Sequence, residues 1–403
     1  MTKGALDGVK VADFSWAAAG PIITKYLAAH GATVIHIESG TRVDMLRMAP
    51  PFKDNKPGIN RSGCFAASMC GKYGITLNLN HPRGVEIAKR IVAWSDVVVE
   101  NFTPGTMAKW GLAYNDLKKL KSDIIMLSSS NQGQTGPRAN FAGFGIQLVS
   151  LAGFTHLTGW PDRAPAGVFV PYTDYISARV ACVALIAALT RRHRIGKGMY
   201  MDISQNEVAL HFLAPYIMDY AVNGRDWNRA GNQCTFAPHG AYRCRGSERW
   251  CAIAVFTDDE WHNLCKVIGR TELANDPDFA TLTARKQNED KVDKLIEQWT
   301  INFTPEEVMG WMQAAGVPAG VVESPEDMRN DPQLEQQHYY WFFDHPEMGR
   351  CCHDGIPFKL SKTPAELRMP AACLGEHNEY VYTKILGMSD GEFVELLKEG
   401  VFE

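Results

Sequence analysis

Short β-branched runs alternate with helical patterns over the first 130 residues, and this alternation constrains the fold more than any other feature. Runs typical of buried strands occur at residues 9–13, 33–37, 96–99 and 124–127. Helices are predicted from Pro21 to about His30 and from Pro82 onward. This rhythm predicts an α/β fold with a Rossmann-like parallel sheet covered on both faces. Ligands of such sheets bind beyond the carboxyl ends of the strands, here residues 14–20, 38–51, 100–105 and 128–137.

The remaining chain predicts a second, smaller domain. A long apolar helix is predicted from about Asp174 to His193. After Gly224 the composition changes, with Arg, Trp, Asn and Gly clustered over 224–233. Strands near 250–255 and 319–322, with one helix starting at Thr257 or Asp258 and another over 304–315, indicate a small α+β domain. We therefore expect a large domain over 1–224, a small domain over 225–330, and a linker with a return to the large domain over 331–403, where Ser389 caps the last helix.

Composition excludes several classes of protein. The 403 residues include 41 Lys plus Arg and 45 Asp plus Glu, a balance that argues against a nucleic-acid binder. The 10 cysteines contain no C-x-x-C pair, so neither a zinc site nor a disulfide framework is expected. The longest apolar run, 176–189, is interrupted by Arg179 and too short to span a bilayer. A cytoplasmic protein without a metal or a membrane partner is expected.

Three common motifs are missing. The first loop, 14–20, lacks G-x-G-x-x-G, and neither a P-loop nor a G-x-S-x-G elbow occurs in the sequence. Nicotinamide chemistry, simple ATP chemistry and a serine hydrolase are therefore disfavoured.

One carboxylate stands out. Asp174 lies where the long apolar helix begins, and the positive end of a helix favours an ionised side chain. An ionised carboxylate at the edge of a core is a competent nucleophile toward an acyl carbon. An ordinary helix N-cap explains the same position. The two interpretations are compatible, and the pattern leaves both open.

Several short segments occur in the order typical of one family. They are residues 6–14, 19–21, 31–38, 75–79, 100–105, 196–198, 201–202, 357–358 and 374–377, with Lys72 and Gly111. In these segments the chain resembles the class III CoA-transferases, the group that includes formyl-CoA:oxalate, carnitine and benzylsuccinate CoA-transferases. The resemblance implies a large domain made from both chain ends, a small inserted domain and two interlocked subunits.

The resemblance also implies site residues. Asp174 would be the nucleophile, carrying an aspartyl-CoA thioester, with acyl-CoA and a small carboxylic acid as substrates and no permanently bound cofactor. Coenzyme A would contact Ser15, Trp16, Arg42 (or Arg47), Lys72, Asn101, Phe102, Lys109 and Arg138. The substrate pocket would include Ala18 and Ala19, whose N–H groups could bind an oxyanion, together with Phe144 and Tyr172, and Trp160 is a further candidate wall.

Alternatives remain for the reaction, the acid and the assembly. A 2-methylacyl-CoA racemase would carry a proton-shuttling His and an Asp where this chain has Phe144 and Gly145. A subunit of a heteromeric transferase, active only with a partner chain, is the other alternative to a homodimer.

Formyl/oxalate enzymes carry His and Gln where Trp16 and Ala18 stand, which disfavours oxalate. A carnitine-like acid or an aryl-substituted succinate, with succinyl-CoA as donor, is expected.

Overall fold

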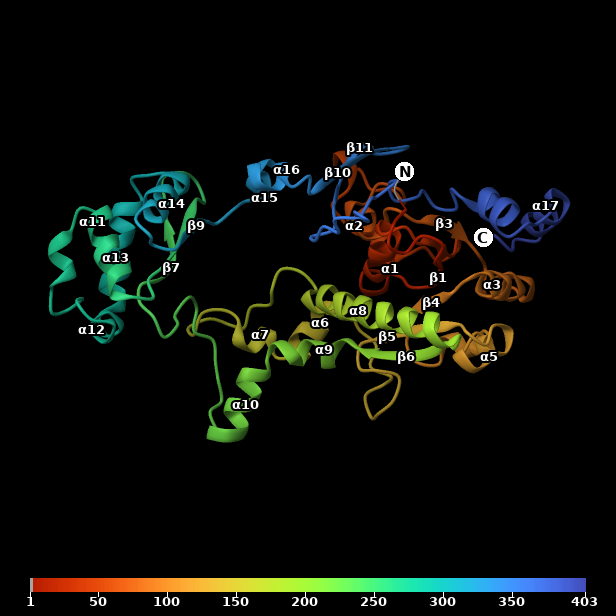
Figure 1. Cartoon of the computed structure of the whole chain (residues 1–403), viewed down its shortest axis with the longest axis horizontal. Helices are drawn as coiled ribbons and strands as arrows, with labels where there is room; N and C mark the ends of the chain where they lie inside the picture. Colours follow the sequence, from red (N-terminus) through yellow and green to blue (C-terminus); the bar gives the residue numbers. More distant parts are fainter. Residues whose placement is uncertain (1–2) are drawn as a thin grey trace. The chain divides into compact units, whose positions relative to one another are not determined.

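The structure, a computed structural model, describes residues 3–403 and divides into two compact units (Figure 1). Unit 1 contains the chain up to Thr155, Gly167–Asp226 and Glu335–Glu403, and unit 2 contains His156–Ala166 and Trp227–Leu334. The divisions near 226 and 334 lie a few residues beyond the predicted 224 and 330. Segment His156–Ala166 was predicted as part of the large domain but belongs to unit 2. A hydrogen bond from the Gly231 N–H to the Gly159 carbonyl, at 2.9 Å, joins this segment to the rest of unit 2.

The elements of unit 1 follow in chain order. They are β1 (Lys10–Asp13), α1 (Ala19–Ala29), β2 (Thr33–Glu38), η1 (Met45–Met48), η2 (Lys53–Asn55), α2 (Gly63–Met69), β3 (Tyr73–Thr76), α3 (Pro82–Trp94), β4 (Val97–Glu100), α4 (Thr106–Lys109), α5 (Tyr114–Leu120), β5 (Ile125–Ser130), α6 (Gly145–Leu151), α8 (Tyr172–Ile195), β6 (Met199–Ser204), α9 (Gln205–Phe212), α10 (Ala214–Asn223), β10 (Tyr340–His345), β11 (Gly349–Asp354), η4 (Tyr380–Ile385) and α17 (Asp390–Lys398). Helix α7 (Phe154–Leu157) crosses the division between the units.

Unit 2 is an α+β unit, as predicted. Its elements are β7 (His239–Arg243), β8 (Trp250–Ala254), α11 (Asp258–Val267), η3 (Thr271–Ala274), α12 (Leu282–Gln287), α13 (Glu289–Thr300), α14 (Pro305–Ala314), β9 (Ala319–Val321) and α15 (Pro325–Asn330), and α16 (Pro332–Gln336) crosses the second division between the units. The strands form a three-stranded antiparallel sheet in the order β7-β8-β9. Thr257 caps α11 by accepting the Glu260 N–H, so this helix begins at Asp258, one of the two predicted starts.

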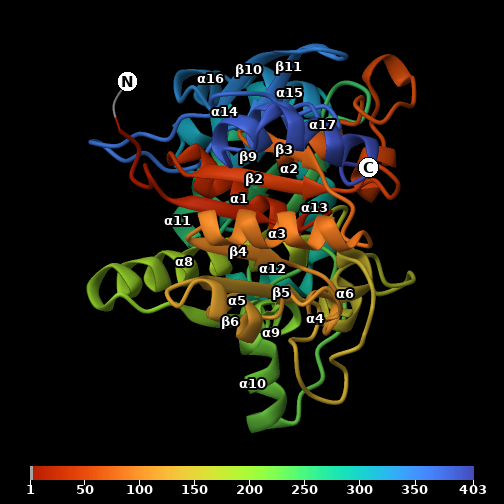
Figure 2. The same ribbon diagram turned by 90° about the vertical axis from the view of Figure 1, so that its right-hand side faces the viewer.

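Unit 1 is built on a six-stranded parallel sheet of order β3-β2-β1-β4-β5-β6. Figure 2 shows α3 and α5 crossing in front of this sheet. The predicted α/β fold with a parallel sheet is confirmed, and four strands lie within a few residues of their predicted bounds. Strands β3 and β6 were not predicted as strands, because β3 contains Gly74 and β6 is rich in methionine rather than in β-branched residues.

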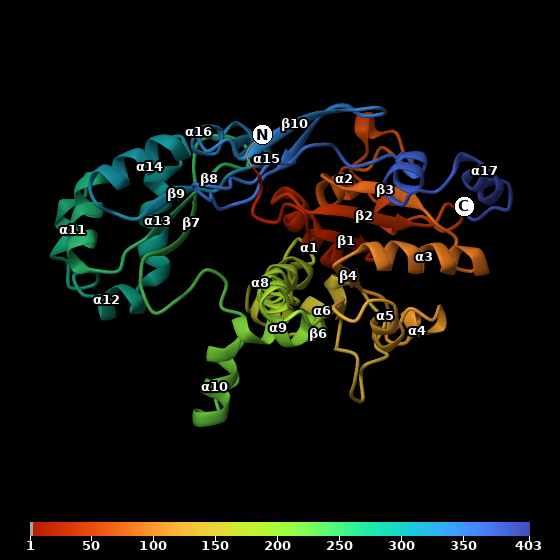
Figure 3. The same ribbon diagram turned by 45° about the vertical axis from the view of Figure 1, so that its right-hand side comes forward.

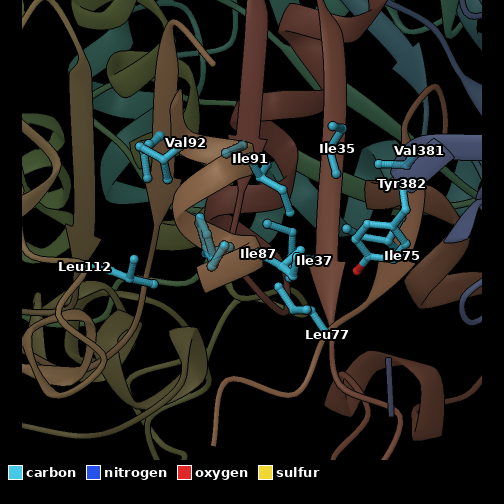
Figure 4. Close-up of a cluster of buried hydrophobic side chains, with 14 of the residues drawn as sticks. Ile35, Ile37, Ile75, Leu77, Ile87, Ile91, Val92, Leu112, Val381 and Tyr382 are labelled. Carbon is cyan, nitrogen blue, oxygen red and sulfur yellow. The ribbon is translucent and has the colours of Figure 1, made fainter. Parts of the chain in front are cut away.

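Side chains that alternate along the strands pack into two separate hydrophobic cores, one on each face of the sheet. Ala12 faces a core with α3 and the C-terminal segment, whereas Val11 faces a core with α1 and α8. Figure 4 shows the first core, where isoleucines of β2 and β3 meet Ile87 and Ile91 of α3, and Figure 3 shows α1 and α8 lying together on the other face. Strands buried on both faces explain the continuous apolar runs in the sequence.

The C-terminal segment returns to the sheet of unit 1. The Tyr382 hydroxyl donates to the Thr76 carbonyl at 2.8 Å, and the Thr76 hydroxyl donates to the Phe402 carbonyl at 2.7 Å. Ser389 accepts the Glu392 N–H and caps α17, as predicted. Both ends of the chain therefore build the large unit.

Helix α8 is longer than the apolar run that predicted it. By length and composition it is the one helix among residues 3–403 that could cross a membrane, and 44% of its most apolar 18-residue stretch is buried in the fold. In the structure it packs against α1, β5 and β6, as the core helix of a folded domain does. Such a helix is weak evidence for a membrane span.

A cluster of buried charges lies at the carboxyl end of β1. Asp13 is fully buried, and its Oδ2 accepts from Lys72 Nζ at 3.1 Å and from the Thr24 hydroxyl at 2.6 Å. Lys72 Nζ also donates to the Pro21 carbonyl at 2.7 Å. One carboxylate therefore ties together β1, the start of α1 and the residue before β3.

Removing the charge of Lys72 tests this cluster. We expect Lys72→Met to lower the free energy of unfolding by about 3–5 kcal/mol, because the buried Asp13 carboxylate loses its lysine partner and keeps only its contacts with Ser15, Thr24 and His36. Chemical denaturation followed by circular dichroism measures the effect. The matched variant Lys118→Met, at an exposed site, should change it by less than about 0.5 kcal/mol. Unchanged stability with weakened CoA binding would instead favour the predicted CoA-binding role of Lys72.

Candidate active site

A cavity of about 640 Å³ opens at the carboxyl ends of β1, β2 and β4 in unit 1. This is the edge of the sheet where ligand binding was expected. Its walls come from the loop after β1, the segments after β2, β3 and β4, the residues before α6, and the first turn of α8. The lining includes Trp16, Ala18, Ala19, Thr41, Arg42, Asn78, Asn101, Phe102, Trp110, Asn131, Phe144, Gly145, Asp174 and Gln205.

Asp174 lies in the cavity wall on the first turn of α8. The helix begins at Tyr172 with Pro171 as its N-cap residue, so Asp174 is the third helical residue and the N-cap interpretation is wrong. Its own N–H donates to the Pro171 carbonyl at 2.9 Å. The side chain is therefore not committed to capping the helix.

Burial controls the charge of Asp174. Desolvation raises the pKa of this carboxyl to about 7, and a hydrogen bond from Thr173 only partly opposes the shift. The expectation that the helix end favours the ionised form is therefore wrong in direction, because the loss of water outweighs the helix dipole. With a pKa of about 7, both the protonated and the ionised form of the carboxyl are accessible near neutral pH.

The absence of a side chain at Gly145 leaves space for the Asp174 carboxylate. A Cβ atom at position 145 would lie 2.4 Å from Asp174 Oδ1 and 2.4 Å from Pro171 Cβ. The Thr173 hydroxyl donates to the Gly145 carbonyl at 3.3 Å, which holds the start of α6 against the start of α8. Any side chain at 145 would therefore displace the carboxylate.

Most of the residues predicted for substrates line this cavity. They are Trp16, Arg42, Asn101 and Phe102 from the predicted CoA set, and Ala18, Ala19 and Phe144 from the predicted substrate pocket. The structure brings them together with Asp174 although they come from widely separated parts of the chain. Their binding roles remain predictions.

Three predicted or alternative CoA-binding residues are buried instead. Ser15 is fully buried and its N–H and hydroxyl both donate to Asp13 Oδ1. Lys72 pairs with Asp13, and the Arg47 guanidinium donates two hydrogen bonds to Glu38. In this structure none of the three side chains faces the cavity, because each neutralises or satisfies a buried carboxylate.

The other predicted residues lie outside the cavity lining. Lys109 is exposed at the end of α4, and Arg138 is exposed in the loop before α6. Tyr172 packs edge-on against Phe154, with ring centroids 5.4 Å apart. Trp160 belongs to unit 2.

The sequence reasoning missed one aromatic wall residue. Trp110 lines the cavity and contacts Phe102 edge-on at 5.6 Å, and Phe102 contacts Trp16 in the same way at 5.9 Å. The Trp16 indole N–H donates to the Ile37 carbonyl at 3.1 Å, which fixes the first ring. Trp110 follows the E-N-F-T-P-G segment by one short helix, and that proximity was the available signal.

The cavity combines an apolar aromatic wall, one cation and two carboxylates, Asp174 and Glu38, of which Glu38 is already paired with Arg47. Arg42 is the only Lys or Arg in the lining within residues 3–403. Groups of His, Cys, Asp and Glu suited to hold a metal ion do not occur in the same range. These features suit a ligand with an aromatic or apolar part and an anionic part, and an acyl group that a carboxylate attacks.

Comparison with known proteins defines the class. The family model for CoA-transferase family III matches residues 6–378, so the chain belongs to this family and is an acyl-CoA-dependent transferase. The resemblance found in the sequence is thereby confirmed.

Two curated relatives and one solved structure illustrate the match. The succinyl-CoA–D-citramalate CoA-transferase of Chloroflexus aurantiacus is 32% identical, covering 97% of this chain and 96% of the relative. The succinyl-CoA–L-malate CoA-transferase beta subunit of the same organism is 30% identical, covering 98% of each chain. The crystal structure of a CAIB/BAIF family protein from Brucella suis has a TM-score of 0.87 and 30% identity, covering 95% of this chain and 100% of that one.

Proposed function

We propose that this transferase moves CoA from succinyl-CoA to a dicarboxylic acid through a covalent thioester on Asp174. The observation that carries the proposal is the half-buried Asp174 carboxylate, free of a capping role, in a cavity that also holds Arg42 and an aromatic wall. The names of the two Chloroflexus relatives support succinyl-CoA as donor and a dicarboxylate as acceptor.

The reaction proceeds in four balanced steps. The Asp174 carboxylate attacks the donor thioester carbonyl, forming a mixed anhydride and releasing CoA thiolate. The thiolate attacks the aspartyl carbonyl, forming the aspartyl-CoA thioester and releasing the donor acid. The acceptor carboxylate attacks this thioester, giving a second anhydride and thiolate. The thiolate then attacks the acceptor acyl carbonyl, which yields the new acyl-CoA and restores Asp174.

The start of α1 supports the oxyanions of these steps. Ala18 and Ala19 line the cavity, and α1 has no side-chain cap at its first turn. The first N–H groups of a helix lack intrahelical partners and accept a developing negative charge. This role for the two N–H groups is part of the proposal.

The acceptor is proposed to be a bulky dicarboxylate, with an aryl-substituted succinate favoured. The Trp16, Phe102 and Trp110 rings form an apolar wall suited to an aromatic ring of either the acceptor or the CoA adenine. A carnitine-like acid is the second candidate, but its quaternary ammonium would share the cavity with the cationic Arg42. A 2-methylacyl-CoA racemase lacks support, since Phe144 cannot shuttle a proton and no histidine lines the cavity within residues 3–403.

The assembly is proposed to be an interlocked homodimer. None of the α10 residues is buried, and α10 extends away from the rest of unit 1 in Figures 1 and 3. Large apolar side chains are exposed on α8 and α10, namely Val180, Val183, Ile186, Ile217, Met218 and Val222. A second copy would cover this surface. The beta-subunit name of one relative keeps a heteromer with a related chain as the alternative.

Replacement of the nucleophile tests the mechanism. We expect Asp174→Asn to abolish transfer and the CoA adduct while CoA binding changes by less than roughly threefold, because the amide keeps the shape but is not nucleophilic. Mass spectrometry of the protein after incubation with succinyl-CoA, with and without hydroxylamine, measures the adduct.

The matched control is Asp116→Asn, at a partly exposed site on α5 outside the cavity lining, which should form the adduct normally. Full activity of Asp174→Asn would contradict the proposal. A wild-type chain that is monomeric by light scattering, and forms the adduct only when a related chain is added, would establish the heteromer instead.

The pH dependence follows from the raised pKa of Asp174. Below a pKa of about 7 the carboxyl is protonated and cannot attack, so the single-turnover rate of adduct formation should fall about tenfold per pH unit on the acid side and level off above 7. Rapid-quench measurements between pH 5 and 9 check this. A rate that is flat down to pH 5, as an ordinary aspartate would give, would contradict the proposal that a desolvated Asp174 is the nucleophile.

A panel of acids tests the acceptor. With succinyl-CoA as donor, we expect kcat/KM for an aryl-substituted succinate to exceed that for oxalate and for carnitine by at least about tenfold, because aromatic surface is buried in the cavity. Trp110→Leu should reduce this preference, while Trp299→Leu in unit 2 should not. Equal rates for all acids would contradict the acceptor class and leave the transferase chemistry intact.

A further inference from the structure

We propose that Asp44 and Asn101 are positioning residues that clamp the loop after β1, so that the next two N–H groups, of Ala18 and Ala19, face the reacting carbonyl. This inference rests on the proposed covalent transfer at Asp174. It assigns a role to Asp44, which the sequence reasoning did not single out, and a different role to Asn101.

Asp44 holds one residue of the loop in an unfavourable conformation. Its side chain is fully buried, Oδ2 accepts the Ala17 N–H at 2.7 Å, and Oδ1 accepts the Leu46 N–H at 2.8 Å. Ala17 has a φ of 61°, a left-handed conformation that an alanine rarely adopts. The carboxylate compensates for this strain, because each of its oxygens satisfies a backbone donor of a different segment.

Asn101 holds the backbone of Trp16, the residue before Ala17. Its Oδ1 accepts the Trp16 N–H at 2.8 Å, and its Nδ2 donates to the Trp16 carbonyl at 2.7 Å. The side-chain amide thus pairs with the Trp16 backbone as a neighbouring strand would. Both ends of the carboxamide are therefore bonded to the Trp16 backbone, and this contact gives the side chain a positioning role through the loop.

The clamps leave two donors open where the reaction takes place. The N–H groups of Ser15, Trp16 and Ala17 donate to Asp13, Asn101 and Asp44 in turn. Within residues 3–403, the N–H groups of Ala18 and Ala19 have no hydrogen-bond partner. Both residues line the cavity that contains Asp174. Donors held in place before the reaction stabilise an oxyanion without reorganisation.

Asp44→Asn is the decisive variant. Asparagine keeps the shape but has one acceptor oxygen, so its NH₂ group must face either the Ala17 or the Leu46 N–H. We expect the rate of Asp174–CoA adduct formation to fall roughly 10- to 100-fold, while the Kd for CoA changes by less than roughly threefold. Asp54→Asn, an exposed site paired with Lys53 and Arg61, should leave both quantities unchanged.

Two further variants separate positioning from general stability. Ala17→Gly in the Asp44→Asn background should recover a large part of the lost rate, because glycine adopts the left-handed conformation without strain. Asn101→Asp, which places an oxygen opposite the Trp16 carbonyl, should lower the adduct rate in the same direction. It also keeps the inference testable if Asp44→Asn does not fold.

The outcomes are distinct. An Asp44→Asn protein with a lower melting temperature but a wild-type adduct rate would overturn the inference, as would a loss of CoA affinity that equals the loss of rate. Absence of rescue by Ala17→Gly would overturn the role of the strained residue. A wild-type protein that transfers CoA without forming an adduct would refute the covalent mechanism, and the transfer rate of the variants would still decide whether the clamp positions the loop.

Discussion

The burial of Asp13 is the constraint on which the active-site edge of the large unit depends. A carboxylate with no access to water must be neutralised and hydrogen-bonded. Lys72, Thr24 and Ser15 meet this requirement from three different segments. The contacts of this one carboxylate hold the end of β1, the first turns of α1 and the residue before β3 in fixed positions. They also fix the start of the loop that follows β1.

The sequence predicted the framework better than the roles of its polar residues. β1, β2, β4 and β5 were predictable because strands buried on both faces show continuous β-branched runs. Lys72 was assigned to CoA because a cation near the sheet edge suits a phosphate. Its partner Asp13 lies 59 residues away in the sequence, so no local pattern could reveal the ion pair.

The sequence predicted several residues that the structure brings into one cavity, and their roles in a site stay predictions. Asp174 and the residues after β1 and β4 line one cavity because the carboxyl ends of parallel strands meet at one edge. The protonation of Asp174 could not be predicted, since desolvation depends on what α6 and Gly145 bring against the side chain. Trp110 was missed because an isolated aromatic residue carries no periodicity.

Hydrogen bonding explains why Asp174, and not Asp44, is the candidate nucleophile. Burial raises the pKa of both carboxyls. Asp44 accepts two backbone N–H groups, one on each oxygen, so attack on a thioester would break the bonds that hold the loop. Asp174 has only the Thr173 hydroxyl as a hydrogen-bonding influence on its pKa, and its backbone rather than its side chain closes the helix start. Asp44 is fully buried and held by two backbone donors, which suits a role in shaping the loop, whereas the half-buried Asp174 carboxylate is free to react in the proposed mechanism.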